Sequence, residues 1–158
     1  MLPGSALAEI LEQEIDSLTQ LQSILQQEYD ALVNADIDAI ESLSARKNAA
    51  LTLQAKLTQA RQGAVRDAAL SDTPEGLQQL ITQSQDSEAL ALAYRKLTEL
   101  AALCHESNRI NGRLIVQKQR QANEALDILR RTDSAAPTYS SQGKTASTGP
   151  GGRTLGKA

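Results

Sequence analysis

A seven-residue repeat of leucines near the start of the chain constrains the fold most. Leu11, Leu18, Leu25 and Leu32 lie seven residues apart, and other apolar side chains stand three or four residues from them (Leu7, Ile15, Leu21 and Tyr29). This spacing gathers apolar groups on one face of an α-helix and is typical of helices that pack against other helices. It predicts one amphipathic helix over residues 6–33.

Three further helices are expected. Asp36 can cap a helix over residues 36–70, in which Lys47 packs its stem in the apolar stripe while its amine reaches water. Pro74 suits the first turn of a short helix over residues 74–83, capped by Asp72 or Thr73 and weakened by Gly76. The longest helix covers residues 86–131. Its seam consists of Leu90, Leu97, Cys104, Asn111, Lys118 and Ala125.

Composition agrees with an all-α fold. Leucine, alanine and glutamine make up 63 of the 158 residues, and the chain has no Trp and no Phe. We expect an elongated antiparallel helical bundle or coiled coil, with three main helices and one short extra helix in a domain over residues 1–131. In residues 132–158, 16 of 27 are Gly, Pro, Ser or Thr. This segment is expected to form a flexible tail, disordered when free, because it can bury little apolar surface.

Charge is distributed unevenly along the sequence. Residues 1–45 hold nine acidic side chains and no basic one, whereas residues 46–158 hold 16 basic and ten acidic side chains. Two solvated helix faces of opposite sign that attract within the fold would explain this pattern. Alternatively, one face is a docking surface for a partner of opposite charge. Nucleic acid is not an expected partner, because the basic stretch 109–131 has no aromatic side chain for base stacking.

Side chains suited to catalysis are scarce. The single histidine, His105, follows the single cysteine, Cys104, and neighbouring helical residues point about 100° apart, so the two cannot form a nucleophile–base pair. We expect Cys104 in the seam and His105 at the surface. A histidine phosphotransfer role is a weak alternative, because such domains usually have Lys-Gly shortly after the histidine and here Glu-Ser-Asn-Arg follows. No enzymatic activity, cofactor or metal is expected.

The sequence also indicates the cellular compartment of the protein. Its longest apolar run has six residues, far fewer than the roughly 20 that a membrane-spanning helix needs. No basic residue precedes Arg46, which argues against a secretory signal, and one cysteine cannot form an internal disulfide. These features predict a soluble cytoplasmic protein without stable membrane insertion.

Two asparagines interrupt the apolar seam of the longest helix. Asn108 and Asn111 could fix the register of packed helices, as buried asparagines do in coiled coils. They could instead mark the point where packing within the chain ends and a partner-binding segment begins. Gly112 beside them would permit a close backbone approach or a bend.

Two regions resemble a known family. The first runs Glu28-Tyr-Asp-Ala-Leu32 and continues with Asp36, Ile40, Leu43, Lys47, Leu51, Leu57 and Arg61. The second is Asn108-Arg-Ile-Asn-Gly-Arg-Leu-Ile115, followed by Ala125-Leu-Asp-Ile-Leu129 and a tail with Tyr139, Gly143 and Leu155. Together they are similar to the flagellar export chaperones of the FlgN family.

The resemblance implies a cytoplasmic chaperone for hook-associated flagellar proteins, which prevents their early assembly and delivers them to the flagellar type III export gate. It also implies that a tyrosine near the mobile end, here Tyr139, docks on the cytosolic domain of the gate.

The expected helix lengths fit client binding. A last helix of about 46 residues is some 27 Å longer than a first helix of about 28. Apolar side chains beyond the shorter helix would then be open to a client helix. The candidate client-binding residues are Asn108, Asn111, Leu114, Ile115, Ala122, Leu126 and Leu129. In the competing interpretation, a structural coiled-coil protein covers this stripe by folding back or by forming a homodimer.

Overall fold

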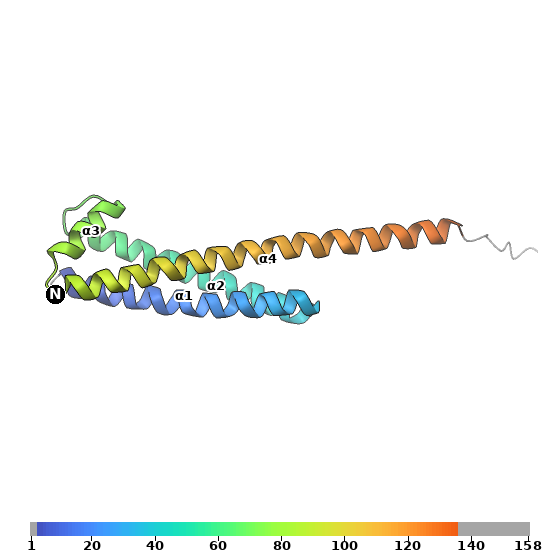
Figure 1. The fold of residues 1–158 in the computed structure, drawn as a ribbon, viewed down its shortest axis with the longest axis horizontal. Coiled ribbons are helices and arrows are strands. Elements are labelled where there is room, and N and C mark those ends of the chain that lie inside the picture. Colours follow the sequence, from blue (N-terminus) through green and yellow to red (C-terminus); the bar gives the residue numbers. More distant parts are fainter. Residues whose placement is uncertain (1–2, 136–158) are drawn as a thin grey trace, which may run out of the picture. The chain divides into compact units, whose positions relative to one another are not determined.

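The computed structural model describes residues 3–135, and this part of the chain is all-α, as expected (Figure 1). The helices are α1 (Pro3–Asn34), α2 (Ile37–Asp67), α3 (Pro74–Gln83) and α4 (Ser87–Ala135). The predicted short helix over residues 74–83 matches α3 at both ends. The largest difference is at the end of α4, which continues four residues beyond the predicted end at 131.

Interhelical contacts fix the directions of the long helices. Two salt bridges join α1 to α2, Glu28 to Lys47 and Glu14 to Arg61, and the residue numbers add to 75 in each, so these helices are antiparallel. Hydrogen bonds between α1 and α4 join residues that lie 83 to 86 positions apart, so these helices are parallel. Helix α1 therefore has α2 and α4 as neighbours.

A leucine seam along α1 forms the centre of the core. Leu11, Leu18, Leu25 and Leu32 are each at most 5% exposed, which confirms the predicted stripe. Tyr29, which was assigned to the same stripe, is instead 39% exposed. On α4 four of the predicted seam residues are buried, whereas Lys118 is half-buried and Ala125 is exposed. The buried ones are Leu90, Leu97, Cys104 and Asn111.

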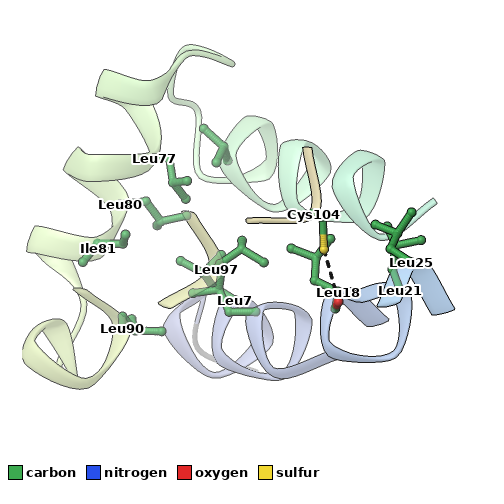
Figure 2. Packing of buried hydrophobic residues seen from close by; sticks show 12 residues of the cluster. Leu7, Leu18, Leu21, Leu25, Leu77, Leu80, Ile81, Leu90, Leu97 and Cys104 are labelled. Carbon is green, nitrogen blue, oxygen red and sulfur yellow. Dashed lines mark hydrogen bonds between the residues drawn. The ribbon is translucent and has the colours of Figure 1, made fainter. Parts of the chain in front are cut away.

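Helix α3 closes one end of this core. Its buried side chains Leu77, Leu80 and Ile81 face Leu7 of α1 and Leu90 at the start of α4 (Figure 2). Burying a leucine or isoleucine side chain contributes roughly 1.5–3 kcal/mol, so a helix of ten residues is stabilised chiefly by these contacts.

Just after the C-terminal ends of α1 and α2, an alanine adopts the left-handed backbone conformation. Ala35 and Ala69 have φ of 53° and 59°. At each junction two backbone hydrogen bonds form the pattern of a Schellman motif, in which glycine is the usual residue at this position. Asp36 then caps α2 by accepting a hydrogen bond from Ala39 N at 3.1 Å, as predicted. Thr73 rather than Asp72 caps α3.

Gly76 is required by close packing rather than being a weak point of α3. A Cβ atom at this position would lie 1.8 Å from the carbonyl oxygen of Ser71, closer than any non-bonded contact allows. Gly63 and Gly112, by contrast, have no atom within 4 Å of such a Cβ. Of the two possibilities at Gly112, a close backbone approach or a bend, the close approach is therefore not present.

Replacing Gly76 by alanine should lower the free energy of unfolding by about 1–3 kcal/mol, because the backbone near Ser71 must shift. The matched Gly63→Ala change should raise it by about 0.5–1 kcal/mol, since alanine is the better helix former and has space there. Urea unfolding followed by circular dichroism measures both. If both changes altered the free energy of unfolding equally, the close contact between Gly76 and Ser71 would be contradicted.

The chain divides into two units, Met1–Arg120 and Gln121–Ala158. The first unit contains α1, α2, α3 and the larger part of α4. In the second unit the structure describes the helical residues 121–135, all of which are exposed. Tyr139 and the rest of the predicted tail lie outside the described residues.

Candidate functional site

Two carboxylates of α1 are buried, whereas the other seven acidic side chains of residues 1–45 are exposed, as in the interpretation of a solvated acidic face. Glu14 is fully buried, and its two oxygens accept hydrogen bonds from Gln54, Thr58 and Arg61 of α2. The Arg61 contact, from Nε to Oε2, is 2.8 Å long. Because each oxygen of Glu14 already has a donor, this carboxylate is suited to holding α1 and α2 together rather than to accepting a proton from a substrate.

A second buried carboxylate joins three helices. Glu28 of α1 is 2% exposed and accepts from Lys47 Nζ of α2 at 2.6 Å and from Asn111 Nδ2 of α4 at 2.8 Å. The same Asn111 nitrogen donates to the carbonyl oxygen of Leu25 at 2.9 Å. The amine of Lys47, expected in water, is thus bound to Glu28. Asn111 holds α4 in register with α1, in agreement with the register interpretation.

Replacing Glu28 by alanine should lower the free energy of unfolding by about 1–3 kcal/mol, because the buried Asn111 and the partly exposed Lys47 would both lose a hydrogen-bond partner. Asp30→Ala, on the exposed face of the same helix, is the control and should change stability by less than about 0.5 kcal/mol. Urea unfolding distinguishes the two. A loss of less than 1 kcal/mol for Glu28→Ala would show that the cluster does not hold the three helices.

An open groove lies beside these clusters. It has a volume of about 510 Å³, and its lining residues come from α1, α2 and the part of α4 before Arg120. We call it the α2–α4 groove. Leucines of α1 form its floor, and the walls are formed by α2 and α4. The lining residues are Glu14, Leu18, Leu21, Leu25, Lys47, Leu51, Gln54, Thr58, Arg61, Tyr94, Leu97, Thr98, Ala101, Cys104, His105 and Asn108.

Cys104 and His105 both line this groove, but they do not form a reactive pair. Cys104 is 5% exposed, and its thiol donates to the carbonyl oxygen of Leu18 at 3.4 Å (Figure 2). Burial raises the pKa of this thiol, which disfavours the nucleophilic thiolate. His105 is exposed, as expected. Within residues 3–135 no three His, Cys, Asp or Glu side chains could hold a metal ion together.

One exposed ion pair lies near the groove on α4. Arg109 donates to Glu106 from Nε to Oε2 at 2.7 Å. This hydrogen bond lowers the pKa of Glu106 and raises the pKa of Arg109. Both groups are in water, so the pair contributes little to stability. Neither group lines the groove.

The residues predicted to bind a client are not gathered in one place. Asn111 is buried and bonded within the fold, Asn108 is exposed and lines the groove, and Leu114 and Ile115 are half-buried. The remaining three, Ala122, Leu126 and Leu129, are exposed in residues 121–135. The prediction did not include Ile128, which is 62% exposed.

A sequence signal for the buried carboxylates was present in α1. Its buried seam runs Leu7, Leu11, Glu14, Leu18, Leu21, Leu25, Glu28 and Leu32, with steps that alternate between four and three residues. Glu14 and Glu28 therefore occupy core positions of the heptad repeat. The hydrophobic pattern instead assigned their neighbours Ile15 and Tyr29 to the buried stripe. A carboxylate in the sequence does not by itself indicate that a basic side chain will face it in the fold.

Comparison with known proteins places the chain in a family. The model of the FlgN protein family matches residues 1–147. The chain belongs to the FlgN family. A solved structure of a flagella synthesis protein FlgN from Pseudomonas aeruginosa is 25% identical, covers 77% of this chain and 93% of its own, and superposes with a TM-score of 0.63. No curated protein matches the chain.

FlgN membership gives the protein a general role as a flagellar export chaperone. The structure also gives a physical reason for several residues on which the resemblance was based. Glu28, Lys47 and Asn111 form the three-helix cluster, and Arg61 bonds the buried Glu14. No helix in the described range has the length and apolar character needed to cross a membrane.

Proposed function

We propose that this FlgN-family protein binds hook-associated flagellar proteins in the cytoplasm, keeps them from assembling early and delivers them to the flagellar type III export gate. The exposed apolar side chains in residues 121–135 carry the proposal. Leu126, Ile128 and Leu129 are 51%, 62% and 61% exposed. Large apolar groups clustered on one exposed helical segment are typical of a surface that another protein covers.

The spacing of these side chains suits a helical partner. Ala122, Leu126 and Leu129 are separated by four and three residues, so they lie along one side of the helix. A client helix with an apolar stripe could pack along this line side by side. The P. aeruginosa FlgN structure supports a role in flagellar synthesis, because its fold matches over most of both chains.

The double change Leu126→Asp and Leu129→Asp should reduce capture of a purified hook-associated protein at least tenfold, because it places two charges on this apolar line. Gln117→Asp with Gln121→Asp adds the same charges to exposed polar positions of α4 and should leave capture unchanged. Circular dichroism checks that both proteins remain helical. Undiminished capture by the folded leucine variant would contradict the client-binding site.

Self-association is the competing use of these side chains. Sedimentation equilibrium of the unaltered protein at micromolar concentration separates the two possibilities. A monomer that captures client supports the proposal. A tight dimer that the leucine variant abolishes, without effect on client capture, would contradict it.

Tyr139 is proposed to dock on the cytosolic domain of the export gate, since an aromatic ring can anchor a chain segment in a pocket. Tyr139→Ala should weaken binding to the purified gate domain about tenfold or more and leave client capture unchanged. Ser140→Ala is the control at the neighbouring position. Loss of client capture together with gate binding would contradict separate roles for the two regions.

A further inference from the structure

We propose that the α2–α4 groove receives the apolar face of an amphipathic client helix whose apolar stripe is flanked by aspartate or glutamate. This inference rests on the proposed chaperone function and adds a second contact surface for the client. The groove lies entirely within Met1–Arg120; of the candidate client-binding residues it contains Asn108 and none in 121–135.

The shape and lining of the groove fit the side chains of a helix. Leu18, Leu21 and Leu25 form an apolar floor with steps of three and four residues, the spacing with which one helix presents a row to another. On the walls, Leu51 is 47% exposed and Ala101 is exposed. A guest helix lying along the walls could insert side chains between them, as knobs enter holes in a helical bundle.

The charge of the groove indicates which helix fits. Lys47, Arg61 and His105 are the basic side chains that line it. Lys47 and Arg61 are partly exposed, and each forms a salt bridge with a buried carboxylate, Glu28 or Glu14, so a guest would meet their remaining N–H donors. The lining carboxylate, Glu14, is fully buried beneath Arg61. A guest with acidic side chains beside its apolar stripe would place them against these basic groups. Electrostatic complementarity of this kind contributes mainly to specificity.

The chain itself offers no such guest helix among its described apolar segments. Residues 118–131 carry four basic and two acidic side chains, so they do not supply the acidic flanks that the basic lining of the groove would bind. Residues 132–158 carry three basic and one acidic side chain, so the same argument applies to them. Helix α1 is acidic, but its apolar face is occupied by the core. A partner is therefore favoured over a second copy or the C-terminal segment.

The experiment uses fluorescence, because the chain has no tryptophan. The full-length Leu51→Trp protein carries one reporter at the groove wall. It is titrated with two synthetic 18-residue amphipathic peptides that share one leucine stripe, flanked by glutamate in one and by lysine in the other. We expect a blue shift of the tryptophan fluorescence on binding. At low salt the glutamate peptide should bind at least tenfold more tightly than the lysine peptide. This preference should shrink as salt is added.

A matched pair of variants locates the peptide. Ala101→Glu places a carboxylate inside the groove, whereas Ala102→Glu places the same side chain at the next exposed position, which does not line it. In the Leu51→Trp background, the first change should abolish the blue shift and the second should leave it intact. His105→Glu should narrow the preference for the glutamate peptide by adding an acid to the wall.

Client capture then separates this inference from the proposed function. If Ala101→Glu weakens capture of the hook-associated protein while Ala102→Glu does not, the groove is a client site. Equal binding of both peptides, equal effects of the two glutamate variants, or a blue shift caused by self-association would overturn the inference. If capture depends on Leu126 and Leu129 alone, the groove inference fails and the chaperone function stands. If the unaltered protein captures no hook-associated protein, the proposed function itself fails.

Discussion

The hydrogen-bonded cluster of Glu28, Lys47 and Asn111 determines how the long helices fit together. Leucine seams attract helices strongly, but a repeated apolar pattern packs almost equally well after a shift of seven residues. A buried carboxylate does not tolerate such a shift, because it would lose the amine and the amide that compensate for its removal from water. Apolar burial therefore supplies most of the stability, and this cluster selects one register among several.

Much of the fold follows from local patterns in the sequence. Some signals act within a few residues, so they predict where the helices begin and which face they bury. These signals are the heptad leucines of α1, the cap at Asp36 and the proline at the start of α3. Gly76 shows the limit of such reasoning. Its low helix propensity suggests a weak point, and only the approach of Ser71 O, five residues away in sequence, shows why glycine is needed.

The candidate sites were harder to predict from the sequence, because they depend on which helices face each other. Leu126 and Leu129 could be identified from periodicity, and the structure shows them exposed. The α2–α4 groove could not, because its floor comes from α1 and its walls from two other helices. Asn111 was recognised as unusual, but its partner Glu28 lies 83 residues earlier, and no local pattern joins them.

The sequence separations of these contacts have a consequence for the order of assembly. Glu28 and Lys47 are 19 residues apart, whereas the bonds from α1 to α4 span 83 to 86 residues. Closing the shorter loop costs less chain entropy, so the α1–α2 hairpin is expected to form early and α4 to dock on it last. During synthesis the hairpin leaves the ribosome first. Until α4 arrives, the leucine row of α1 lacks its contacts with Leu97 and Cys104 of α4.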